Sequence, residues 1–286
     1  MRTLLLTLLL AGAVAIIAPA QEKDAAFEVA SVKANKSGDS NGNLRLQPGG
    51  RVNAVNMPVR PIITFAYQLA QYQLIGGPGW LATDRYDLVA KMEGDVDPAT
   101  IIPGANTPSP MQLALRRLLE ERFKLRAHRE TRDMDIYALV MAKPGGAPGP
   151  GLKPTTQDCA AAAAAARRGG PPPTGKPGEP FCGIQGGPGR LKFGGLPASA
   201  FAQAFSGQAG RMVIERTGLT GGWDFELVYA VEGRGGPGGG ADAAPVDPNA
   251  PSFFTAIQEQ LGLRLEPTKG PVEVLVIDSI EKPVED

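Results

Sequence analysis

The most constraining feature of the chain is an internal repeat: residues 51–142 and 190–280 align with an offset of 137–139 positions. The matching segments are Arg51–Pro58 with Arg190–Pro197, Leu74-Ile75 with Val213-Ile214, Tyr86-Asp87-Leu88 with Trp223-Asp224-Phe225, and Phe123–Arg126 with Leu261–Arg264. Self-similarity over such a length is typical of two similar small domains and not of a solenoid of many short units. The repeat therefore predicts an architecture and leaves the chemistry open.

Hydrophobic spacing predicts the element order β-α-β-β-α-β-β in both copies. Ser109 followed by Pro110 marks the start of a helix in the first copy. Ser252 is predicted to cap the matching helix of the second copy, and Gly262 is suited to end it. Each copy is predicted to close with two short strands: Leu125–Arg129 and Ile136–Ala142 in the first, Leu263–Glu266 and Val272–Ile277 in the second. We expect an α+β fold of two repeated modules, each a small mixed sheet with two helices.

These elements place the first module at residues 27–142 and the second at residues 190–280. Residues 143–189, between the modules, are rich in proline, glycine and alanine, as are residues 233–251. Such composition cannot supply a hydrophobic core. We therefore expect a linker between the modules and a flexible insertion within the second module.

The N-terminus has the pattern of a Sec-type signal peptide over residues 1–20. Arg2 precedes an apolar run, and Ala18-Pro19-Ala20 forms a small-residue cleavage site. The run is too short for a comfortable membrane span, although an uncleaved anchor is the alternative. We expect cleavage after Ala20, a periplasmic or secreted protein, and no membrane span after cleavage.

The only two cysteines, Cys159 and Cys182, both lie in the predicted linker. A lone pair of cysteines in an exported protein usually forms a disulfide, so we predict one here that staples the linker. A metal or redox site is the competing interpretation. It is disfavoured because the pair lacks CxxC spacing and has no histidine nearby.

Charge excludes one class of partner. The chain has 29 basic and 29 acidic residues, and loss of residues 1–20 with Arg2 leaves a net charge of −1. Binding to nucleic acid needs a basic excess, so we expect no nucleic-acid partner. The locally basic segment 116–132 also contains glutamates, which favours a solvated face with ion pairs.

Several long phrases of this sequence resemble one family. They are FEVASVK, GGPGWL followed by DRYDLVAK, LLEERFKLRAHRET, TGLTGGWDFEL and TAIQEQLGLRLEPTKGPVEVLVID. Together they resemble the large soil-associated family of secreted bacterial proteins with a domain of unknown function, over essentially the whole mature chain. The resemblance implies an exported protein of this size and carries no established activity.

Each repeat also resembles, more weakly, the short N-terminal domain of secretins and TonB-dependent receptors. The phrase FTAIQEQLGLRLE is similar to the leucine-rich helix and following strand of that domain. No secretin pore or receptor barrel follows here. Ring assembly and transport gating are therefore not implied.

The search for catalytic groups centres on His128, the only histidine. One histidine can act as a general base, but the sequence has no GxSxG nucleophile elbow to partner it. A hydrolase would have to use His128 with Arg126, Glu130 or Asp133. Because paired-histidine metal motifs are impossible and no phosphate loop is complete, we expect no metal and no cofactor. A surface histidine on a strand is the plainer interpretation.

Two pairs of charged residues recur between the copies: Asp87 with Asp224, and Arg126 with Arg264. Recurrence indicates structural roles, either an internal ion pair or a strand-end hydrogen bond. A duplicated ligand site is the sharper alternative.

The leading hypothesis is a non-enzymatic module of the cell envelope that binds a protein or peptide, because small sheets offer free edges to a partner strand. The alternatives are binding of a small glycan or peptide and a hydrolase with an unrecognised site around His128. Trp80, Tyr86 and Trp223 are candidate binding residues, with His128, if they line a pocket between the modules.

Overall fold

The computed structural model describes residues 25–39, 41–93, 107–159, 161–162, 164, 181–187, 189–231 and 249–283. Within these ranges the chain forms five α-helices, one 3-10 helix and 12 strands in three four-stranded sheets. The predicted α+β class is confirmed. The predicted signal peptide and most of the predicted insertion at 233–251 lie outside the described residues.

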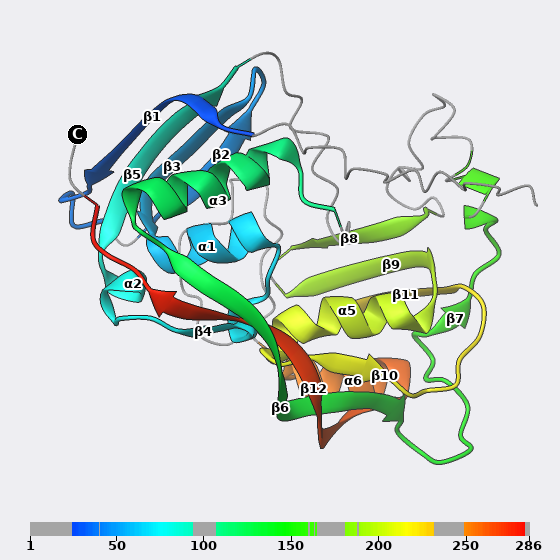
Figure 1. Ribbon diagram of the computed structural model, residues 1–286. Coiled ribbons are helices and arrows are strands. Elements are labelled where there is room, and N and C mark those ends of the chain that lie inside the picture. The colour runs from blue at the N-terminus through cyan, green and yellow to red at the C-terminus, as the bar shows by residue number, and fades with distance from the viewer. Residues whose placement is uncertain are drawn as a thin grey trace, which may run out of the picture.

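Sheet A is antiparallel and has the order β1-β5-β3-β2. Its strands are β1 (Phe27–Ala34), β2 (Asn43–Gln47), β3 (Arg51–Pro58) and β5 (Arg85–Met92). Alternate residues of these strands are buried, which is the pattern of a sheet with one packed face. The helices α1 (Val59–Tyr67) and α3 (Pro110–Arg122) cover that face, as Figure 1 shows.

Sheet C is also antiparallel and has the order β7-β11-β9-β8. Its strands are β7 (Lys153–Pro154), β8 (Gly183–Gly187), β9 (Arg190–Leu196) and β11 (Trp223–Val228). The helices α5 (Ala198–Ala209) and α6 (Phe253–Leu261) pack on it. The core here is aromatic: the rings of Phe193 and Phe225 stack at 4.4 Å, and Phe201 meets both edge-on.

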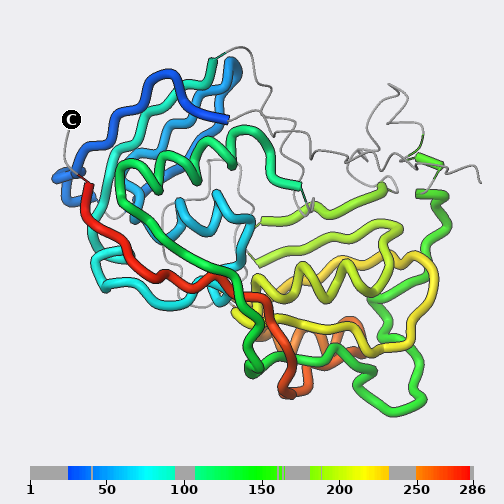
Figure 2. Tube along the Cα trace, viewed as in Figure 1, coloured from blue at the N-terminus to red at the C-terminus, as the bar shows by residue number. Residues whose placement is uncertain are grey.

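Sheet B joins the two halves. It has the order β10-β6-β12-β4 and is mixed, because the short strands β4 (Leu74–Gly76) and β10 (Val213–Glu215) pair parallel to their neighbours. The central strands β6 (Arg126–Met141) and β12 (Leu263–Ser279) form one long antiparallel pair. Figures 1 and 2 show both strands running from one half of the molecule into the other.

These long strands correct the prediction of two short strands at the end of each copy. The polar segment between the predicted strands of β6 stays extended and paired, from Glu130 to Asp135. Pro267 and Pro271 do not interrupt β12, because β4 pairs only with its residues 275–277. A proline that lacks a partner on its open side removes no ladder hydrogen bond there.

Each long strand begins in one core and ends in the other. Leu275 and Ile277, at the end of β12, are buried in the core of sheet A. Leu139, near the end of β6, is buried in the aromatic core of sheet C. The prediction of a mixed sheet within each half is therefore wrong. Sheets A and C are antiparallel, and mixed pairing occurs in the shared sheet B.

The predicted helix boundaries at three positions are confirmed. The Ser109 hydroxyl accepts from the backbone N–H of Gln112, whose side chain accepts from the Ser109 N–H, forming a capping box. Ser252 caps α6 in the same way through the N–H of Thr255. Gly262 ends α6 with a φ of 66°, a left-handed conformation that favours glycine.

The predicted linker at 143–189 contributes more than was expected. It supplies β7 and β8 to sheet C, and Leu152 is buried in the core beneath that sheet. Composition alone hid this contribution, because two edge strands and one apolar residue need no hydrophobic periodicity. The remaining segments are a 3-10 turn, Gln71–Gln73, and the short helix α2 (Trp80–Thr83).

Candidate functional site

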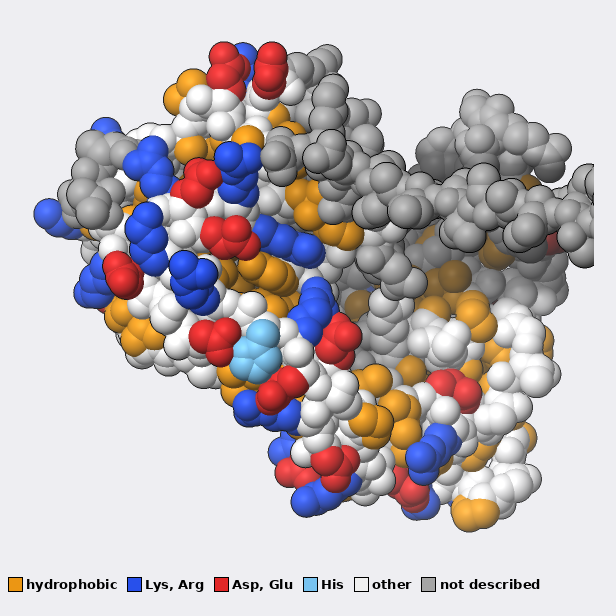
Figure 3. Space-filling view, in the orientation of Figure 1, with side chains coloured by type: hydrophobic (Ala, Val, Ile, Leu, Met, Phe, Trp, Pro, Cys, Tyr) orange, Lys and Arg blue, Asp and Glu red, His pale blue; other side chains and the backbone are white. Residues whose placement is uncertain are grey.

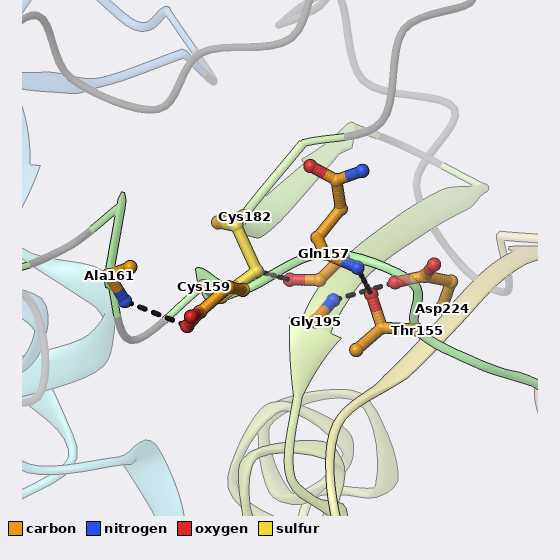
Figure 4. Close-up of a disulfide and its surroundings, with 9 residues drawn as sticks. Thr155, Gln157, Cys159, Ala161, Cys182, Gly195 and Asp224 are labelled. Carbon is orange, nitrogen blue, oxygen red and sulfur yellow. Dashed lines mark hydrogen bonds between the residues drawn. A yellow bond between two sulfur atoms is a disulfide. The ribbon is translucent and has the colours of Figure 1, made fainter.

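The disulfide predicted between Cys159 and Cys182 is present and lies beside strand β8 (Figure 4). Cys182 directly precedes β8, and the two Cα atoms are 5.4 Å apart. Cys159 packs against Gly195 of β9, where an added Cβ would lie 2.0 Å from the Cys159 sulfur. Gly195 also has a φ of 65°, so both its space and its backbone require glycine.

A hydrogen bond to Asp224 holds this glycine in place. The Gly195 N–H donates to the Asp224 carboxylate at 2.7 Å, next to an irregularity in the β9–β11 register. In sheet A, the N–H of Asn56 donates in the same way to Asp87 at 2.8 Å. The predicted strand-end hydrogen bonds of the two recurring aspartates are confirmed. Of the recurring arginines, Arg264 pairs with Glu266 along its own strand.

Strand β8 is the edge of sheet C that the disulfide anchors. Its sequence is Gly-Ile-Gln-Gly-Gly, without a charged residue, and it pairs with β9 over all five residues. Residues 184–187 are exposed, and Ile184 keeps 51% of its surface open. Within the described ranges, β9 is its one strand partner.

The other strand edges of the described chain are protected in ways that β8 is not. On β1, Arg122 donates to the Ala30 carbonyl at 3.4 Å. On β4, Arg60 donates to the carbonyls of Leu74 and Gly76. Strand β2 carries a central arginine, and β7 and β10 have only two and three residues. Charge, capping and shortness are the usual means by which proteins block edge-to-edge pairing.

His128 lies on the exposed surface of β6, as Figure 3 shows by its pale-blue colour among acidic and basic side chains. Its Nδ1 is 2.8 Å from the Asp278 carboxylate, and its Nε2 is 3.6 Å from Glu130. The hydrogen bond to Asp278 and its negative charge raise the pKa of His128. The Arg132 guanidinium, hydrogen-bonded to Glu130, lowers the pKa of that carboxylate.

This cluster is a set of surface ion pairs. The His128 side chain is 51% exposed and lies on a strand, not in a cleft. Of its predicted catalytic partners, Glu130 approaches the ring, whereas no contact with Arg126 or Asp133 is found in the described chain. No serine, threonine or cysteine of the described residues hydrogen-bonds to the imidazole. A triad-like arrangement would need such a nucleophile.

The aromatic candidates are divided between the two cores. Tyr86 is buried beneath sheet A, and Trp80 meets it edge-on with ring centroids 6.5 Å apart. Trp223 is buried in the other core, where its indole N–H donates to the Thr220 carbonyl at 3.0 Å. The three rings therefore do not converge on one pocket, and His128 lies apart from them on the surface.

One open pocket of about 470 Å³ lies at the end of sheet A. Polar side chains dominate its lining, with Asn35, Asp39, Asp84 and Arg85 around the buried Tyr86. The backbone beneath it is fixed, because the Asn56 carbonyl accepts from Arg85 at 2.8 Å and the Asn35 amide donates to Asp87. Neither Trp80 nor Trp223 lines this pocket.

The described residues contain no group of three or more histidine, cysteine, aspartate or glutamate side chains placed to hold a metal ion. They also contain no helix that is long and apolar enough to cross a membrane.

Fold and site together define an α+β protein with a disulfide-anchored, uncharged edge strand. The chain belongs to the DUF3738 family, described as proteins of unknown function, whose model matches residues 60–280. Comparison with curated proteins finds no match, and neither does comparison with solved structures.

Proposed function

We propose that this protein is an exported, non-enzymatic interaction module that accepts an extended segment of a partner protein on the edge of β8. The observation that carries the proposal is the combination found in β8: five residues, no charge, high exposure and no second strand partner within the described residues. An extended segment added there gains main-chain hydrogen bonds, and alternate side chains supply specificity.

Anchoring of β8 supports this role. The disulfide joins the residue before β8 to a segment packed against β9, and β9 pairs along the whole of β8. A strand that is already extended and held loses little further conformational entropy when a partner pairs with it. A disulfide is typical of proteins outside the cytoplasm, which agrees with export directed by residues 1–20.

The side chain of Ile184 adds an apolar contact to the edge. It is one of five large apolar side chains that remain exposed in the described chain. Its neighbours Gly186 and Gly187 carry no side chain, so a partner backbone can approach closely there. We expect the partner segment to be extended and to present apolar or small residues toward Ile184.

The test is a crosslinking capture from cell-envelope extract, with the protein as bait. The bait variant Gln185→Lys places a charge in the middle of β8 and should abolish capture of the specific partner. The matched control is Gln208→Lys on the exposed surface of α5, which adds the same charge away from the edge. Capture should survive in this control.

Pairing on β8 is then measured directly with the captured protein. The amides of β8 that point away from β9, alternate residues within Gly183–Gly187, should exchange with solvent at least tenfold more slowly in the complex, because each new ladder bond protects its donor. Equal capture by both lysine variants, or unchanged exchange at β8, would contradict the proposal.

A second candidate function is binding of a small polar ligand, a glycan or short peptide, in the pocket at the end of sheet A. It is favoured by the pocket's volume of about 470 Å³ and by the density of hydrogen-bonding groups around Tyr86. Titration with short oligosaccharides and peptides, followed by changes in tyrosine and tryptophan fluorescence, tests it. Arg85→Ala should weaken a genuine ligand, and Gln208→Lys should not.

A further inference from the structure

The outer face of sheet A, opposite α1 and α3, carries several exposed basic side chains. Strand register places three cations on this face: Arg51 lies directly opposite Lys91, and Arg45 lies opposite Asn53, two residues further along β3. All three side chains are exposed, and none forms an ion pair with another described residue. A fourth cation, Lys33, lies opposite Asp87 at the end of the sheet.

Like charges directly opposite one another destabilise an antiparallel pair. Arg51 and Lys91 are such a pair, in the middle of the sheet where β3 meets β5. Two exposed acidic residues lie nearby, Glu93 two positions beyond Lys91 and Glu28 at the irregularity of β1, and within the described residues neither forms an ion pair with Arg51 or Lys91. An anion that bridges Arg51 and Lys91 would remove this repulsion, so the face is suited to a negatively charged partner.

In sheet C, the arginine at the position that corresponds to Arg51 has an acidic partner. Arg190 matches Arg51 at an offset of 139, and it forms an ion pair with Glu226 at 3.1 Å. Glu226 in turn matches Val89, at an offset of 137. Sheet C thus carries an acid where sheet A carries a valine, and its outer face is neutralised from within. Within the described strands of sheet A, the register partners of Arg51 are Gln47 and Lys91, so no acid lies opposite it.

Exposed valines lie among these cations. Val29 is 63% exposed, Val89 is 57% exposed and Val55 is 40% exposed, and the register places all three on the outer face. Three exposed β-branched residues on one face gain nothing from a fully hydrated polyanion. They gain from a surface that offers both negative charge and hydrocarbon, which is the composition of an anionic membrane interface.

We infer that the outer face of sheet A is a docking surface for anionic lipid headgroups. Arg45, Arg51 and Lys91 contact the phosphate groups, and Val29, Val55 and Val89 enter the layer between them. This association is peripheral and needs no membrane span. It is independent of β8, so it neither requires nor excludes the proposed protein partner.

The inference is tested by co-sedimentation of the full chain with vesicles of phosphatidylcholine, alone or mixed with an equal amount of phosphatidylglycerol. Binding should require phosphatidylglycerol and should weaken with added salt. A basic residue near an anionic surface contributes about 1 kcal/mol, so Arg51→Gln should weaken binding roughly fivefold. Val89→Glu gives sheet A the acid that sheet C carries at the matching position, Glu226. This variant should abolish binding.

The matched control is Arg190→Gln, which removes the same charge from the equivalent position of sheet C. It should change vesicle binding less than twofold, because Glu226 already neutralises that arginine. Circular dichroism checks that each variant is folded, and Arg51→Lys, which keeps the charge, should bind like the wild type.

Three results would overturn the inference. They are equal binding to neutral and anionic vesicles, equal loss in Arg51→Gln and Arg190→Gln, and binding to soluble polyglutamate without binding to anionic vesicles. The last result would assign the face to an acidic protein instead. Capture of a partner on β8 is unaffected by any of them, so the two proposals fail separately.

Discussion

The backbone N–H of Gly195 donates a hydrogen bond to the carboxylate of Asp224, 2.7 Å away. The same relationship holds in sheet A between Asn56 and Asp87. In both places the donor has a left-handed backbone, with φ of 65° for Gly195 and 54° for Asn56. The aspartate accepts the N–H that a distorted strand leaves without a ladder partner, which explains why the residue recurs.

Removal of this acceptor should therefore destabilise the fold. We expect Asp224→Ala to lower the free energy of unfolding by about 1–3 kcal/mol, the cost of leaving a partly buried donor unsatisfied. Asp224→Asn keeps an acceptor oxygen and should cost less. Urea denaturation measures both, with the exposed neighbour Glu226→Gln as control. Equal stability of the alanine variant and the wild type would contradict this account.

The disulfide should stabilise the fold and organise β8 locally. It closes a loop with a sequence separation of 23 residues, and loop-closure entropy for that size predicts about 3 kcal/mol. We expect the Cys159→Ser, Cys182→Ser double variant to lose roughly that amount in urea denaturation. Amide exchange should accelerate first in Gly183 to Gly187. Faster exchange in sheet A, with β8 unchanged, would contradict a local role.

The His128–Asp278 contact predicts a pH dependence of stability. Because Asp278 raises the pKa of His128 in the folded state above its ordinary value of 6.5, the contribution is fully present below that value. It is lost as the pH rises through the raised folded pKa. The difference in melting temperature between the wild type and His128→Gln should shrink from acidic to alkaline buffer. An NMR titration of the imidazole gives the pKa itself, which Asp278→Asn should lower.

A substitution at Leu275 tests whether the end of β12 packs in the core of sheet A. It belongs to β12, yet its side chain is 2% exposed within the core of sheet A. Leu275→Ala should cost about 2–5 kcal/mol, because it leaves a cavity in a packed core. Hydrogen exchange should place the loosened region in α1 and α3, not in α5 and α6. Faster hydrogen exchange confined to α5 and α6 would contradict the placement of Leu275 in the core of sheet A.

The sequence predicts local structure well where one residue determines it. Ser109, Ser252 and Gly262 mark the helix ends because capping chemistry depends on the residue and its nearest neighbours. The long strand β12, which ends in the core of the other half, was not predicted because its contacts join residues far apart in the sequence. Whether Leu275 and Ile277 join their own half or the other depends on packing in the core that contains α1 and α3, which no local pattern records.

The candidate site was predicted in part. The disulfide between Cys159 and Cys182 was predictable because the chain has only two cysteines. Strand β8 was not predictable, because it has one apolar side chain and so shows no alternation of apolar and polar residues. The exposure of His128 was the plainer of two interpretations, because its neighbours along the strand are charged. A glycine-rich stretch directly after a paired cysteine is the signal that would have drawn attention to the edge.

The shared sheet also has a consequence for the order of folding during synthesis. The first half of the chain has its helices and four of its strands early, yet its core stays incomplete until Leu275 and Ile277 have been made. Since domains normally fold in order as the chain emerges, we expect the first half to complete its core only after β12 has been made. Its folding should then depend on the strand that the two halves share.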